Sequence, residues 1–60
     1  MKESPIHRIV TRAVSEARTR GEDYLGQTES AVRAVLAVET DLTASEALQA
    51  VKRIREQPKS

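Results

Sequence analysis

The stretch ETDLTASEALQAVKRIR, residues 39–55, carries the signals for a turn between two helices. It reads as the end of one helix, a short turn and a second, amphipathic helix. Thr43 and Glu46 have the spacing of a capping box, in which each side chain accepts a hydrogen bond from the backbone N–H of the other residue. An apolar stripe at helical spacing follows and consists of Ala44, Ala47, Leu48, Val51 and Ile54. Pro58 limits continuation, so the sequence predicts a helix over approximately residues 44–56.

A first helix is predicted nearer the N-terminus, over approximately residues 5–20. Ser4 suits the N-cap, and Pro5 suits the first helical position because its missing N–H is not needed there. Gly21 can adopt the left-handed backbone conformation that ends many helices. The apolar stripe between these signals consists of Ile6, Ile9, Val10, Ala13, Val14 and Ala17.

The segment between these two helices is more apolar. In SAVRAVLAVE, residues 30–39, the apolar arc covers more than half of the helical wheel, which suits a helix packed on two sides. The β-branched run AVLAV raises a strand alternative, but the length and the Ala content favour a helix. With Thr28 as N-cap the helix spans approximately residues 28–39. A start after Asp23 is the alternative, and Gly26 counts against it.

Sixty residues make a single small domain, and its ends at residues 1–3 and 57–60 are expected to fray. The fold class is therefore all-α, a compact domain of three helices. With no Cys, Phe or Trp and a single Tyr, the chain has no disulfide, and its core must come from small aliphatic side chains. Association with a second copy or a helical protein partner would add buried area, and we expect it to occur through the middle helix.

Nothing in the sequence has the pattern of an active site. The chain carries no motif for a nucleotide, a metal or a catalytic triad, so we expect no enzyme and no cofactor. His7 is the only candidate for a proton shuttle at neutral pH, and its place at the edge of the first apolar stripe favours a boundary residue. The first residues lack the apolar core of a signal peptide, and no apolar run could span a bilayer. We therefore expect a cytoplasmic protein without a membrane partner.

The charged residues are nearly balanced. Ten Lys and Arg oppose nine Asp and Glu, a net charge of +1, whereas dedicated nucleic-acid-binding proteins are usually more basic. Six of the nine acidic residues lie near predicted helix N-termini and five of the ten basic ones near C-termini, as the helix dipole favours. Glu29 and Arg33 are spaced as an i, i+4 ion pair. Arg55 stands out because it falls on the apolar side of its helix, which an exposed helix end or an acidic partner would explain.

The helix over residues 44–56 also raises a DNA-binding hypothesis. DLTASEALQAVKRI, residues 41–54, resembles the recognition half of bacterial helix-turn-helix and winged-helix regulators, where a similar Leu-Thr/Ser turn precedes the helix that enters the major groove. The turn lacks the usual Gly, and Glu46 would bring a carboxylate close to the phosphates. The resemblance implies DNA contacts from Thr43, Ser45, Gln49, Lys52 and Arg53.

The interpretation we favour is a protein interface on the middle helix. A wide apolar arc that two neighbours cannot cover completely would leave a strip open to a partner. The side chains expected on that strip are mostly small enough for another helix to approach closely: Ala31, Ala34, Val35, Ala37 and Val38. The sequence thus predicts a non-catalytic regulatory or adaptor module that acts through protein–protein interaction and homodimerises, with helix-turn-helix DNA binding as the alternative.

Overall fold

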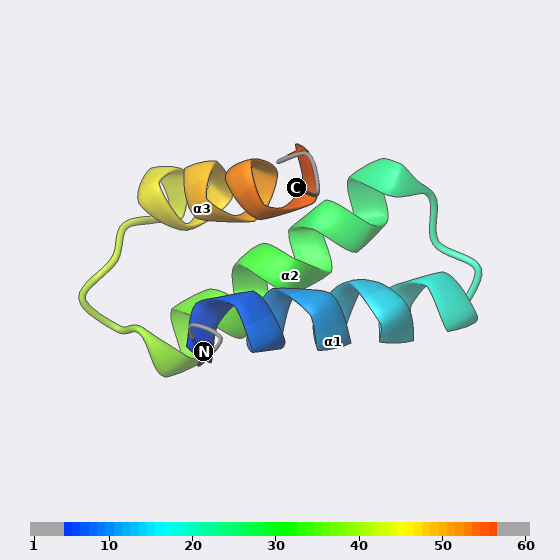
Figure 1. Ribbon diagram of the computed structural model, residues 1–60, viewed down its shortest axis with the longest axis horizontal. Coiled ribbons are helices and arrows are strands. Elements are labelled where there is room, and N and C mark those ends of the chain that lie inside the picture. The colour runs from blue at the N-terminus through cyan, green and yellow to red at the C-terminus, as the bar shows by residue number, and fades with distance from the viewer. Residues whose placement is uncertain (1–4, 57–60) are drawn as a thin grey trace.

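The computed structural model describes residues 5–56 and contains three helices in that range: α1 (Pro5–Thr19), α2 (Tyr24–Val38) and α3 (Ala44–Glu56) (Figure 1). No strand occurs among the described residues, so the all-α prediction is confirmed and the strand alternative for AVLAV is wrong. The expected cap at Ser4 and the expected fraying of both ends lie outside the described residues.

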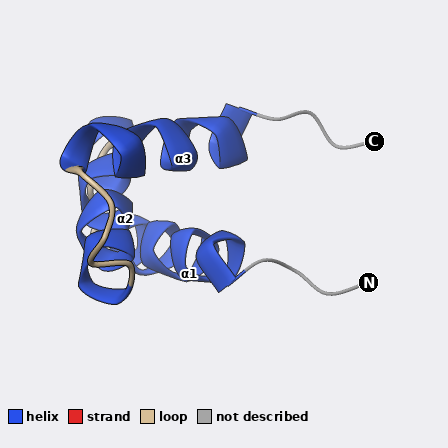
Figure 2. Ribbon diagram, turned by 90° about the vertical axis from the view of Figure 1, so that its left-hand side faces the viewer, coloured by secondary structure: helices blue, strands red, loops and turns tan. Residues whose placement is uncertain are grey.

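The central element is α2, which crosses between the other two helices (Figure 1). Both α1 and α3 pack mainly on α2 and make few contacts with each other. They extend to the same side of α2, so the three helices outline the letter C in Figure 2. The wide apolar arc of the middle helix therefore packs against two neighbouring helices, as its pattern indicates.

The end of α1 follows the expected glycine stop. Gly21 has a φ of 87°, in the left-handed region. Its N–H donates to the carbonyl of Arg18 at 2.9 Å, and the N–H of Glu22 donates to the carbonyl of Ala17 at 3.1 Å. These two bonds make a Schellman motif, which satisfies carbonyls that the end of a helix leaves open. The chain then reverses within a few residues and begins α2.

The helix α2 begins at Tyr24, which confirms the alternative start after Asp23 and makes the start at residue 28 wrong. Asp23 is the N-cap, and its Oδ1 accepts a hydrogen bond from the N–H of Gly26 at 2.9 Å. Thr28 lies inside the helix, where its hydroxyl donates to the carbonyl of Tyr24 at 3.0 Å. A helical glycine costs about 1 kcal/mol relative to Ala, and an N-cap contributes about as much. The Asp23 cap therefore offsets the glycine that had argued against this start.

The start of α3 confirms the capping box. The N–H of Thr43 donates to Oε1 of Glu46 at 2.9 Å, and the N–H of Glu46 donates to Oγ1 of Thr43 at 3.1 Å. Leu42, just before the box, packs against the core. The bounds of this helix match the prediction because the signals that set them are local.

The core is built from small side chains. Its buried apolar members are Val10, Val14, Ala17, Ala31, Val35, Ala47 and Val51, and the largest that are fully buried are valines. Every Leu and Ile of the described range is at least partly exposed: Ile6, Ile9, Leu25, Leu36, Leu42, Leu48 and Ile54. Ala44 and Leu48 were expected in the buried stripe of α3 but are exposed. Since α3 packs mainly on one neighbour, only a narrow arc around Ala47 and Val51 is covered.

Candidate functional site

The structure divides the predicted interface of the middle helix into a buried and an exposed part. Ala31 and Val35 have no exposed surface and belong to the core shared by the three helices. Ala34 is half-buried, whereas Ala37 is exposed and Val38 is 58% exposed. Two of the five residues therefore hold the fold together and are not open to a partner. The helical wheel alone cannot distinguish the buried residues from the exposed ones, because both lie on one continuous apolar arc.

The solvent-facing side of α2 has a regular pattern of its own. Leu25, Glu29, Arg33 and Ala37 follow one another at i, i+4 spacing, and all four are exposed. We call them the outer ridge of α2. Leu25 is 68% exposed, more than any other large hydrophobic residue of the described range. Leu25 is not among the residues predicted for the interface, although its spacing to the other three ridge residues is visible in the sequence.

A shallow hollow lies beside the outer ridge, between α2 and α3. Its lining residues are Glu29, Val32, Arg33, Ala44 and Leu48. The apolar members come from both helices, and the charged ones both belong to the outer ridge. Leu48 is 40% exposed here, on the flank of α3 that faces α2. The hollow therefore combines three apolar side chains with the acidic and the basic side chain of the outer ridge.

Glu29 and Arg33 do not form the ion pair that their i, i+4 spacing predicts. The ion pairs among the described residues are Arg12–Glu16 and Arg20–Glu22, so the expected pair of Glu29 with Arg33 is absent from that range. Both side chains are exposed at the edge of the hollow. A carboxylate and a guanidinium one turn apart thus remain available to groups outside the chain.

The residues of the DNA-binding alternative lie on α3 and just before its first residue. Ser45, Gln49, Lys52 and Arg53 are all exposed there. Thr43 is exposed as well, but its hydroxyl oxygen already accepts the N–H of the capping box. Glu46 and Glu56 are also exposed on this helix, so two acidic side chains accompany the two basic ones. The outer side of α3 therefore has no excess of positive charge for a phosphate backbone.

The position of Arg55, which the sequence left unexplained, has a structural cause. Its Nη1 donates to Oγ1 of Thr28 at 2.8 Å and to the carbonyl of Tyr24 at 3.2 Å, and its Nη2 donates to Oε1 of Gln27 at 2.9 Å. Gln27 in turn donates to the carbonyl of Glu22 at 2.9 Å. The partner is thus a set of neutral oxygens at the start of α2, and neither an exposed helix end nor an acidic partner is the explanation. We call these contacts the Arg55 clamp.

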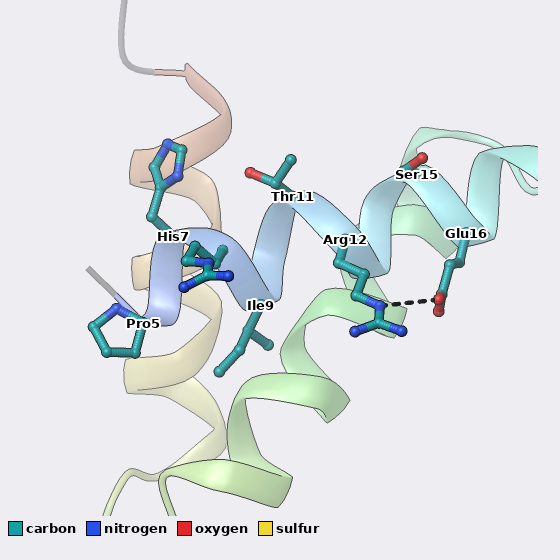
Figure 3. A pocket seen from close by; sticks show the side chains of 8 residues that line it. Pro5, His7, Ile9, Thr11, Arg12, Ser15 and Glu16 are labelled. Atoms are coloured by element: carbon teal, nitrogen blue, oxygen red, sulfur yellow. Dashed lines mark hydrogen bonds and ion pairs between the residues drawn. The ribbon is translucent and has the colours of Figure 1, made fainter. Parts of the chain in front are cut away.

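A second hollow follows the outer side of α1 (Figure 3). All its lining residues belong to this one helix, so it is an open surface and not a cleft between elements. His7, Thr11 and Ser15 point to one side of it and Ile9 to the other. Arg12 and Glu16 form an ion pair at 3.4 Å in which both side chains are largely exposed. His7 is exposed too, and it is not at the edge of the core as its spacing predicted.

The comparisons with known proteins give no family. No family model matches the chain, and neither a curated protein nor a solved structure is significantly similar to it. Within residues 5–56 no helix has both the length and the apolar character that crossing a bilayer requires. Groups of three or more His, Cys, Asp or Glu side chains that could hold a metal do not occur in the same range.

Proposed function

We propose that this domain is a non-catalytic regulatory or adaptor module that acts through protein–protein interaction and self-associates as a homodimer. One observation carries the proposal: the larger aliphatic side chains all remain partly exposed, whereas the buried core consists of Val and Ala. A chain of this size buries a smaller fraction of its surface than a larger domain does, so covering these side chains in an interface would add markedly to its buried apolar area. The distribution fits a fold that is completed by a partner.

The free energy gained by burying these side chains supports this interpretation. Burial of apolar surface contributes about 25 cal/mol for each Å², or about 1.5–3 kcal/mol for one aliphatic side chain moved fully from water. In a chain of 60 residues the core alone rarely supplies more than about 5 kcal/mol of net stability. Covering Leu25 and Leu48 in an interface would therefore add a large fraction of the total. Self-association stabilises the folded chain by mass action.

The hollows support binding over catalysis. An acid–base or nucleophilic site needs reactive side chains in a sheltered cleft. The hollow on α1 is open, and its ion pair of Arg12 with Glu16 is largely exposed to water. The hollow between α2 and α3 holds two opposite charges on an apolar floor. An apolar core with a polar rim is the arrangement that protein interfaces share.

DNA binding is the second candidate, and it is favoured by one observation. Gln49, Lys52 and Arg53 are all exposed on one side of α3, where a helix in a major groove would need them. The carboxylate of Glu46 lies at the start of the same helix, where the N–H of Thr43 holds it in place. Phosphates would meet that fixed negative charge, so this candidate ranks below self-association.

Two measurements distinguish the candidates. Sedimentation equilibrium at micromolar concentration should give about twice the chain mass of 6.7 kDa. A monomer at high micromolar concentration with a sharp, cooperative melt would contradict the proposal. A titration with generic duplex DNA at several salt concentrations tests the alternative, since phosphate contacts make affinity fall steeply with salt. Sub-micromolar binding that is lost when Gln49 and Arg53 are both changed to Ala would favour DNA.

A further inference from the structure

We infer that the outer ridge of α2 binds the same ridge of a second copy, antiparallel across a two-fold axis, with Glu29 facing the partner's Arg33. The inference rests on the self-association proposed above and specifies its surface and register. The carrying observation is the unpaired, opposite charges of Glu29 and Arg33, one turn apart on the exposed side of one helix.

Two-fold symmetry explains why these charges suit a second copy. In such an interface, a residue that contacts a different residue of the partner subunit is itself matched by the reciprocal contact. If Glu29 faces the partner's Arg33, then Arg33 must face the partner's Glu29. One chain thereby forms two complementary ion pairs with its copy. A parallel arrangement in register would instead bring like charges together at both positions, which is destabilising.

The same register matches the two ends of the outer ridge. Leu25 lies one turn before Glu29, and Ala37 lies one turn after Arg33. Antiparallel pairing therefore places Leu25, which is 68% exposed, against the partner's Ala37. A large side chain meets a small one at each end, which allows the two helices to approach closely. The charged pairs lie in the middle and the apolar contacts lie on either side of them.

The hollow next to the outer ridge supplies the remaining apolar area. Val32, Ala44 and Leu48 line it at the level of the two charges, close to where the axis would pass. Side chains of the second copy can enter it there and cover Leu48. Because exposed ion pairs contribute only about 0–1 kcal/mol each, the apolar contacts supply most of the affinity. The charges fix orientation and register.

Charge reversal tests this arrangement. Glu29→Arg and Arg33→Glu each replace both complementary pairs with like-charged ones, and we expect either change to weaken self-association about tenfold or more at low salt. A one-to-one mixture of the two variants restores complementary charges at every contact. The mixture should therefore associate as tightly as the natural chain, and the double variant carrying both changes should do the same. Sedimentation equilibrium and circular dichroism would measure association and folding for each sample.

Arg12→Glu is the control on another helix: it reverses an exposed charge on the outer side of α1 and breaks the ion pair with Glu16, but it should leave the dimer unchanged. A natural chain that stays monomeric would overturn the proposed function together with this interface. A dimer that neither single variant weakens would leave the proposed function standing and overturn the register. Weakening by both variants without recovery in the mixture would likewise exclude the antiparallel pairing.

Discussion

Arg55 stacks on Tyr24: the guanidinium carbon lies 3.9 Å from the centroid of the ring, while Nη1 donates to the carbonyl of the same tyrosine at 3.2 Å. The two residues are 31 positions apart. Their contact joins the last turn of α3 to the first turn of α2. The two helices therefore run in opposite directions, and this contact holds one end of the pair together. This arrangement places Ala44 and Leu48 beside the outer ridge of α2 and thereby forms the hollow.

The Arg55 clamp should contribute measurably to stability. Arg55→Ala removes three hydrogen bonds and the ring contact, and it leaves the nearly buried Gln27 short of a donor. We expect a loss of roughly 1–3 kcal/mol in the free energy of unfolding, measured by urea denaturation. Arg55→Lys should recover only part of it, because an ammonium cannot reproduce the planar fork of donors. Arg53→Ala is the exposed control, and an equal loss there would mean that the clamp contributes nothing.

The capping box should contribute more to the stability of the fold than the exposed residues beside it do. Thr43→Ala removes the hydroxyl that accepts the N–H of Glu46, at an expected cost of roughly 1 kcal/mol. Ser45→Ala changes the same kind of group two residues later, at a position where no cap is lost, and should stay within about 0.5 kcal/mol. Chemical denaturation of both variants gives the comparison. Identical midpoints would show that the Thr43 hydroxyl is dispensable.

A side chain at position 21 should destabilise the fold only through the left-handed backbone conformation of Gly21. A Cβ built there meets no atom within 4 Å, so any loss of stability comes from the positive φ of 87°. We expect Gly21→Ala to lower the free energy of unfolding by roughly 1–2 kcal/mol. Gly21→Asn should be milder, since Asn tolerates this conformation better than Ala. Thermal melts of the two variants decide the order, and a more stable Ala variant would argue against the Schellman motif.

The two faces of α2 should respond differently to substitution. Val35→Asp buries a carboxylate without a partner among the three helices and should abolish the helical circular dichroism signal. Arg33→Ala, on the exposed outer ridge, should keep the helical signal and change the unfolding midpoint of the monomer little. A folded Val35→Asp chain would show that the face assigned to the core is wrong.

The ends of the helices were largely readable from the sequence. Thr43 with Glu46 predicted the start of α3, and Gly21 predicted the end of α1, because each signal acts between groups at most a few residues apart. The start of α2 was harder. Asp23 and Thr28 are both good N-cap residues, and propensity disfavours Gly26 inside a helix. The cap at Asp23 and the tertiary contacts of Thr28 decided between them.

Local signals along the chain were enough to predict three helices and most of their ends, because hydrogen bonds near helix ends depend on neighbouring residues. Which part of each apolar arc is covered depends instead on how the helices pack. Leu48 and Ala47 are adjacent on the same stripe, yet Ala47 is buried and Leu48 forms part of an open hollow. The hydrogen-bond partners of Arg55 could not be predicted from the sequence either, since they belong to another helix. Burial and long-range pairing depend on how the helices cross, and helical periodicity does not specify that geometry.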